Sequence, residues 1–138
     1  MGKRRSFKQV RDAFNKSPYH RLLGIEVTDI RKGKSRVRMA FRQKLSHLDG
    51  FVAGGAIASL ADSSVAMALM SLVEPSKKIM VIEFKINFFV RVYEGELTAE
   101  TEIIHKNSNT AVGATEVMNE DGKLVAKLIG TYNIERVD

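Results

Sequence analysis

The sequence predicts an α+β fold in which a curved antiparallel sheet wraps around one long central helix. Residues 54–73 contain no proline and are apolar on nearly every side of a helix, which requires burial on most sides. The segments before and after them alternate apolar and polar residues with a period of two, as strands with one buried face do. A sheet curved around residues 54–73 is the simplest way to bury them.

The first part of the chain predicts a short helix followed by two strands. Apolar residues recur at helical spacing in residues 6–15, so we expect an amphipathic helix there, interrupted at Pro18. Residues 23–30 and 35–41 have the composition and alternation of strands, and a tight turn at Gly33 joins them.

The second half of the chain predicts four strands. A long strand begins at Ile79, where the period changes to two, and the Asp121-Gly122 pair is a hairpin signal before the last strand. The three strands after the long one are expected over residues 97–105, 110–118 and 124–134. We therefore divide the chain into an N-terminal helical segment, residues 1–22, and one larger domain, residues 23–138.

Composition and charge limit the classes of function. The 138 residues carry a formal net charge of +6, mostly through basic residues in the first 44, and include no cysteine. Without cysteine there are no disulfides, thiolate nucleophiles or cysteine metal sites, and a cytoplasmic location is expected. A basic surface attracts nucleic acid, acidic membranes or phosphorylated ligands. No nucleic-acid recognition motif accompanies the charge, so nucleic acid is not an expected partner.

Asp62 is the only charged residue between Asp49 and Glu74. Its place in the middle of the apolar segment argues against a transmembrane span, for which about 20 residues would suffice. Burying a lone carboxylate is costly unless it is paired or functional, so Asp62 is a candidate general base. The alternative is a structural aspartate bonded to the backbone or to neighbouring serine hydroxyls.

The Gly54-Gly55 pair opens the predicted helix, where unpaired amides and the positive end of the helix dipole favour developing negative charge. Such amides could form an oxyanion hole. Gly54 and Asp62 are eight residues apart, or roughly 12 Å along a helix. That is too far for both to act on one carbonyl, so they can cooperate only if Gly54 of one chain faces Asp62 of another, in a dimer.

Other chemical signals are weaker. His47 lies seven residues before Gly54 and could donate a hydrogen bond near the site, although a loop histidine is more often simply exposed. His20 and His105 have no partner at metal-ligand spacing, so no metal is expected. The sequence has neither the G-x-S-x-G nucleophile motif nor a phosphate-binding loop.

Residues 47–63, HLDGFVAGGAIASLADS, resemble the signature of the PaaI-type hotdog-fold acyl-CoA thioesterases. In that signature an Asn and a Gly precede His-Gly-Gly, and a Leu-x-Asp lies on the following helix. Residues 88–97 resemble the family's exit from its long strand, and the resemblance covers about residues 23–134. The chain departs from the pattern at two positions, with Ala53 in place of the family's His and His47 in place of its Asn.

The resemblance implies a hotdog fold, a homodimer formed by pairing the long strand, a homotetramer, and hydrolysis of a small, medium or aromatic acyl-CoA without a separate cofactor. It implies that Asp62 activates water or attacks directly, while the Gly54 amide of the partner chain polarises the thioester. The remaining candidates that it implies are Gly55, Ala53 and Val81 near the thioester, and Arg91, Lys106 and Asn107 near the nucleotide. The alternative, favoured by Ala53, is a hotdog protein that binds acyl-CoA or fatty acid without hydrolysing it.

Overall fold

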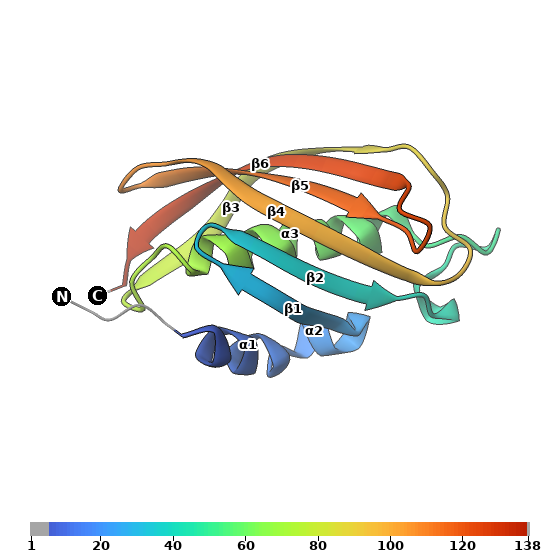
Figure 1. Ribbon diagram of the computed structural model, residues 1–138, viewed down its shortest axis with the longest axis horizontal. Helices are drawn as coiled ribbons and strands as arrows, with labels where there is room; N and C mark the ends of the chain where they lie inside the picture. The colour runs from blue at the N-terminus through green and yellow to red at the C-terminus, as the bar shows by residue number, and fades with distance from the viewer. Residues whose placement is uncertain (1–5, 138) are drawn as a thin grey trace.

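The computed structural model describes residues 6–137, so the first five residues of the N-terminal segment and Asp138 lie outside the described residues. The elements in chain order are α1 (Phe7–Asn15), α2 (Pro18–Leu23), β1 (Ile25–Arg31), β2 (Lys34–Ala40), the 3₁₀ helix η1 (Gln43–Leu45), α3 (Gly54–Met70), β3 (Lys77–Phe88), β4 (Glu96–Lys106), β5 (Thr110–Met118) and β6 (Leu124–Arg136). The sheet curves over α3, and α1 and α2 lie beside β1 (Figure 1). The expected α+β hotdog fold is confirmed.

The six strands form one sheet in the order β1-β2-β4-β5-β6-β3, and all neighbouring strands are antiparallel. Apolar side chains of α3 and of the sheet's inner face make the core, with Leu60, Val65 and Leu128 among the fully buried residues. The sequence predicted a helix that is apolar on nearly every side and buried on most of them. Ten of the 17 residues of α3 are buried, in agreement with this.

A chain of buried hydroxyl groups fixes α3 against the sheet. The Ser35 hydroxyl of β2 donates to the backbone carbonyl of Ser64 in α3 at 2.5 Å, and Thr101 of β4 donates to the Ser64 hydroxyl at 2.7 Å. Thr101 also bonds Thr115 of β5, 2.5 Å away. Because buried polar groups are costly when unpaired, this network favours one rotation of the helix, and with it one placement of Asp62.

Two of the element boundaries that differ from the sequence prediction have a clear physical reason. The helix predicted over residues 54–73 ends at Met70, because the Ser71 hydroxyl donates to the Ala68 carbonyl and accepts the Gly33 amide at 2.8 Å. Pro18 was expected only to interrupt the first helix, but it begins α2, since proline suits the first helical position. Leu23 therefore closes α2 and does not open β1.

β3 is an edge strand with an apolar surface. It pairs with β6 on one side and with none of the described strands on the other. Met80 and Ile82 are each 58% exposed, and Phe88 is 48% exposed. A long, free and apolar edge is a template for pairing with another chain.

Candidate active site

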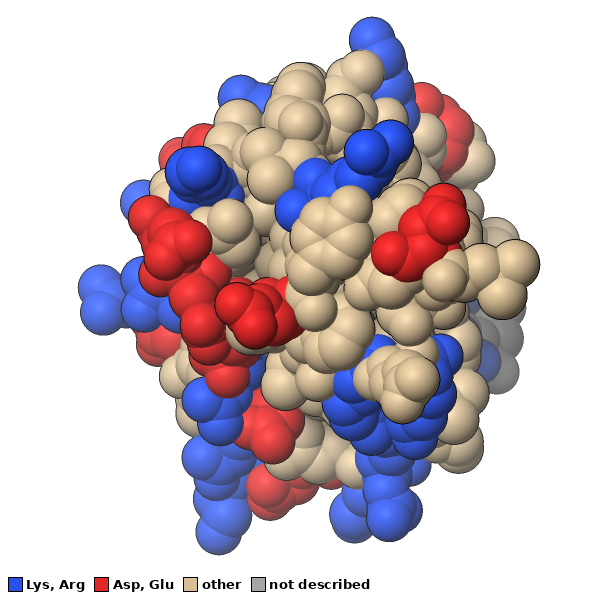
Figure 2. Space-filling view, turned by 90° about the vertical axis from the view of Figure 1, so that its right-hand side faces the viewer, with Lys and Arg blue, Asp and Glu red and all other residues tan. Residues whose placement is uncertain are grey.

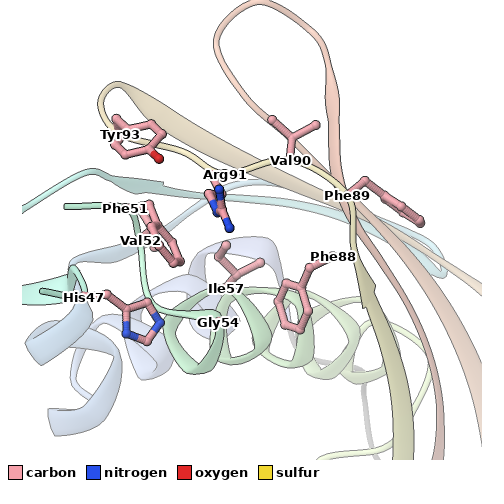
Figure 3. A pocket seen from close by; sticks show the side chains of 10 residues that line it. All are labelled: His47, Phe51, Val52, Gly54, Ile57, Phe88, Phe89, Val90, Arg91 and Tyr93. Carbon is pink, nitrogen blue, oxygen red and sulfur yellow. The ribbon is translucent and has the colours of Figure 1, made fainter. Parts of the chain in front are cut away.

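A cavity of about 780 Å³ lies at the N-terminal end of α3. Its lining residues are His47, Phe51, Val52, Gly54, Ile57, Phe88, Phe89, Val90, Arg91 and Tyr93. Figure 3 shows Gly54 at the start of the helix, with His47 and Phe51 on one side and Phe88 on the other. Four aromatic rings and three aliphatic side chains make most of this lining, and only a few polar groups join them, as in small-molecule sites generally.

The first amides of α3 open towards this cavity without a side-chain cap. The N-cap is Ala53, which has no hydrogen-bonding side chain, and none of the described residues caps the helix in its place. A Cβ built on Gly54 would lie 3.3 Å from Cζ of Phe88, whereas one on Gly55 would meet nothing within 4 Å. Gly54 is therefore the glycine in contact with the cavity wall, and its N–H is one that lacks an intrahelical partner.

The loop before α3 brings the polar residues of the cavity together. The Val52 amide donates to the Val92 carbonyl at 2.8 Å, which ties this loop to the segment after β3. The Arg91 guanidinium lies 5.3 Å from the centre of the Phe51 ring, and the His47 ring lies 4.8 Å from the same ring. The structure thus brings His47, Ala53, Gly54 and Arg91, all predicted site residues, to one end of α3.

Asp62 lies in the middle of α3, away from this cavity. It was expected to be a lone buried charge, but its side chain is only partly buried and has a partner. The Tyr132 hydroxyl of β6 donates a 2.5 Å hydrogen bond to Oδ1 of Asp62. Tyr132 is 1% exposed. Its burial, together with the hydrogen bond and negative charge of Asp62, raises the pKa of Tyr132 far above its ordinary value.

Two further predicted residues lie in the row of the sheet that faces Asp62. The register pairs Lys106 with Ala111, Ala111 with Tyr132, and Tyr132 with Val81. Val81 is therefore the immediate neighbour of the tyrosine that holds Asp62, and Lys106 is two strands away, roughly 10 Å at the usual spacing. Asn107 lies in the next turn, where its side chain accepts the Asn109 and Thr110 amides.

One protomer therefore carries two half-sites. The first is the cavity with Gly54, and the second is Asp62 with Tyr132 and Val81. Gly54 and Asp62 are eight positions apart on a continuous helix, which separates them by roughly 12 Å along the axis. Neither half holds both a carboxylate and a free helix amide.

Sequence reasoning missed two residues near Asp62. Tyr132 is 70 residues away in the chain, and no local pattern marks it. His20 of α2 stacks on Phe14 with ring centres 3.9 Å apart. Burial lowers the pKa of His20, opposed by the Phe14 backbone and by the negative charge of Asp62.

Residues 6–137 lack two features of other classes of protein, a cluster of metal ligands and a membrane-spanning helix. No group of three or more His, Cys, Asp or Glu side chains there is arranged to hold a metal ion. No helix in the same range is long and apolar enough to cross a membrane. Figure 2 shows that the end of the molecule facing the viewer carries acidic and basic side chains around an uncharged centre.

Comparisons with known proteins agree with this architecture. Residues 49–126 match the family described as the thioesterase superfamily. A 1,4-dihydroxy-2-naphthoyl-CoA hydrolase of Listeria monocytogenes is 27% identical over 103 residues, which are 75% of this chain and 84% of that protein. The conserved protein PA5202 of Pseudomonas aeruginosa is 30% identical, with a TM-score of 0.85 over 90% of this chain and 98% of that one. The PaaI protein of E. coli, 23% identical, shares the fold, with a TM-score of 0.85 over 96% of this chain and 93% of that one.

The fold and the family match over residues 49–126 define a thioester hydrolase. The chain belongs to the thioesterase superfamily, because the family match spans more than half of its length.

Proposed function

We propose that the protein hydrolyses a small, medium or aromatic acyl-CoA to the free acid and CoA, at sites shared between two chains. The observation that carries this proposal is the division of one protomer into a Gly54 half-site and an Asp62 half-site. Each half supplies what the other lacks, and the two lie too far apart to serve one carbonyl within a chain. The substrate itself provides the CoA moiety, and no separate cofactor is needed.

The exposed edge of β3 supports a dimer as the working unit. A second copy that pairs antiparallel along this edge continues the sheet and covers Met80, Ile82 and Phe88. The two α3 helices then run in opposite directions. This allows the N-terminal end of one helix to lie against the middle of the other, where Asp62 is. We also propose that two such dimers form a tetramer, and that the protein works in the cytoplasm.

In the proposed reaction, Asp62 takes a proton from water, and the resulting hydroxide attacks the thioester carbonyl. Negative charge develops on the carbonyl oxygen and is stabilised by the partner's Gly54 amide and by the positive end of α3. The carbon–sulfur bond then breaks, and the CoA thiolate receives a proton. The alternative course is direct attack by Asp62, followed by hydrolysis of the anhydride.

Further candidates take supporting roles in this proposal. Gly55 leaves the approach to the helix end open, because nothing lies within 4 Å of its missing Cβ. His47 stands where a donor could compensate for the missing side chain at Ala53. We assign the phosphates of CoA to Arg91 at the cavity and to Lys106 and Asn107, at and just after the end of β4, because guanidinium and ammonium groups bind phosphates well.

The cavity favours an aromatic or medium acyl group. Phe51, Phe88, Phe89 and Tyr93 supply rings that can pair with an aromatic substrate at edge or offset geometry. The naphthoyl-CoA substrate in the name of the Listeria relative is of this kind. A panel of acyl-CoAs of increasing chain length, with aromatic members, assayed by thiol release, defines the acyl group.

The test of the assignment is the Asp62→Asn variant in the same assay. We expect it to fold and to lose at least roughly 100-fold in turnover, the usual scale for a general base. Asp49→Asn, in the loop before α3, is the matched control and should keep wild-type turnover. Unchanged hydrolysis by Asp62→Asn refutes the assignment. Tight acyl-CoA binding by the wild type without thiol release would instead support the binding protein that Ala53 favours.

A further inference from the structure

We infer that Tyr132 is a positioning residue that fixes the plane of the Asp62 carboxylate and leaves its second oxygen for the reaction. The inference rests on the proposed function, since it assigns Asp62 the reacting carboxylate. It starts from the 2.5 Å hydrogen bond that the Tyr132 hydroxyl donates to Oδ1 of Asp62. Among residues 6–137 this is the only hydrogen bond to the Asp62 side chain, so Oδ2 is free.

The packing around the Tyr132 ring holds it in a single position. It is the largest of the fully buried side chains, on a strand that pairs with Ala111 of β5 and Val81 of β3. A Cβ on Gly130 would come within 3.0 Å of Cε1 of Tyr132, so the absence of a side chain at Gly130 makes room for this ring. The hydroxyl group is therefore held by the packing of the sheet, independently of Asp62.

Tyr132 is also a permanent donor. Burial, and then the neighbouring carboxylate, raise the pKa of Tyr132 so that the phenol keeps its proton across the range in which proteins work. Its O–H can then only give a hydrogen bond to Asp62, a charge-assisted bond of the stronger kind.

The Asp62 carboxylate needs a hydrogen-bond partner to stay in one orientation. The terminal torsion of its side chain is broad and roughly two-fold, so a carboxylate on the partly exposed face of α3 would otherwise rotate. Reaction rates depend steeply on the placement of the reacting atoms, and a misplacement of about 1 Å can cost about 100-fold. A fixed phenol on the sheet behind Asp62 selects one orientation before substrate arrives.

The first test compares Tyr132→Phe with Tyr19→Phe by steady-state hydrolysis. Tyr132→Phe removes only the hydroxyl, and we expect kcat to fall roughly 10- to 100-fold with KM nearly unchanged, because orientation and not binding is lost. Tyr19→Phe removes another phenolic hydroxyl bonded to α3, that of Tyr19 to Ser59 at 2.6 Å, and should leave kcat at the wild-type value. A Tyr132→Phe variant that folds and keeps wild-type kcat overturns the inference, as does an equal loss in both variants.

The second test does not depend on activity or on the folding of Tyr132→Phe. Tyr132 becomes the single tyrosine when Tyr19 and Tyr93 are replaced by Phe, so its hydrogen bond can be followed at neutral pH by near-ultraviolet absorbance, which shifts to longer wavelength when a phenol donates to a carboxylate. Asp62→Asn in this background should move the band to shorter wavelength, because a neutral amide accepts a weaker hydrogen bond than a carboxylate. Identical spectra overturn the inference. If the wild type shows no hydrolysis but the spectra differ, the proposed function fails and the Tyr132–Asp62 contact stands.

Discussion

Removal of a single N–H group at the start of α3 tests the oxyanion role directly. Gly54 occupies the first helical position, where proline is well tolerated because its missing N–H has no intrahelical partner. The preceding residue, Ala53, has φ −62° and ψ 137°, the extended conformation that a following proline requires. Gly54→Pro should therefore fold like the wild type while it loses the proposed donor and adds the bulk of its ring.

The expected loss follows from what one preorganised donor contributes. Deleting such a donor costs about 100- to 1,000-fold in kcat, or about 2.7–4 kcal/mol of transition-state stabilisation. Gly54→Ala is the matched control, because it adds a Cβ at the same position and keeps the N–H. That Cβ lies 3.3 Å from the tip of Phe88, a close contact that a shift of a few tenths of an ångström in the ring relieves, so Gly54→Ala should lose less than roughly 10-fold.

The assay is thiol release at saturating acyl-CoA, with the melting temperature of each variant as a check on folding. Comparable losses in Gly54→Pro and Gly54→Ala would assign the effect to the added bulk and would refute the role of the amide. Wild-type kcat in a folded Gly54→Pro variant would refute it as well.

Three further predictions concern assembly, packing and pH. Ile82→Lys on the exposed edge of β3 should shift the protein from dimer to monomer in light scattering, with loss of hydrolysis; a variant that stays dimeric would contradict β3 pairing. Gly113→Ala should destabilise the fold by about 1–3 kcal/mol in urea unfolding, because its Cβ would lie 2.6 Å from Val65 Cγ1, and an unchanged midpoint would count against this packing. Burial lowers the pKa of His20 in the folded protein below the value of 6.5 that it has in the unfolded chain. On acidification the unfolded chain therefore takes up this proton before the folded protein does, and the free energy of unfolding decreases as the pH falls below 6.5. The melting temperature of His20→Gln should therefore fall less on acidification than that of the wild type, and equal falls would contradict this.

Much of the fold followed from the sequence because its signals are periodic and local. The alternation in residues 110–118 placed β5 at the bounds that the structure has. The apolar segment opened by Gly54-Gly55 placed the start of α3, and the helical rise between Gly54 and Asp62 predicted that the two would be separated. These inferences need only distances along the chain.

The rest depends on contacts between distant segments. Tyr132 meets Asp62 through the β5–β6–β3 register, and one tyrosine in an alternating strand carries no mark of its partner. Alternation in β3 showed that one face is apolar, but not that Met80 and Ile82 are exposed in a single chain. The end of α3 at Met70 also depends on a long-range contact, the bond between Ser71 and Gly33.

The most direct test of a shared site is complementation between two inactive variants. Asp62→Asn and Gly54→Pro chains, mixed and allowed to exchange subunits, form heterodimers in which one site has an intact Asp62 and an intact Gly54 amide. A random mixture should regain roughly one quarter of wild-type turnover, since half of the dimers are mixed and each mixed dimer has one complete site of two. If heterodimers form and the mixture stays as inactive as its parents, Gly54 and Asp62 do not meet across chains.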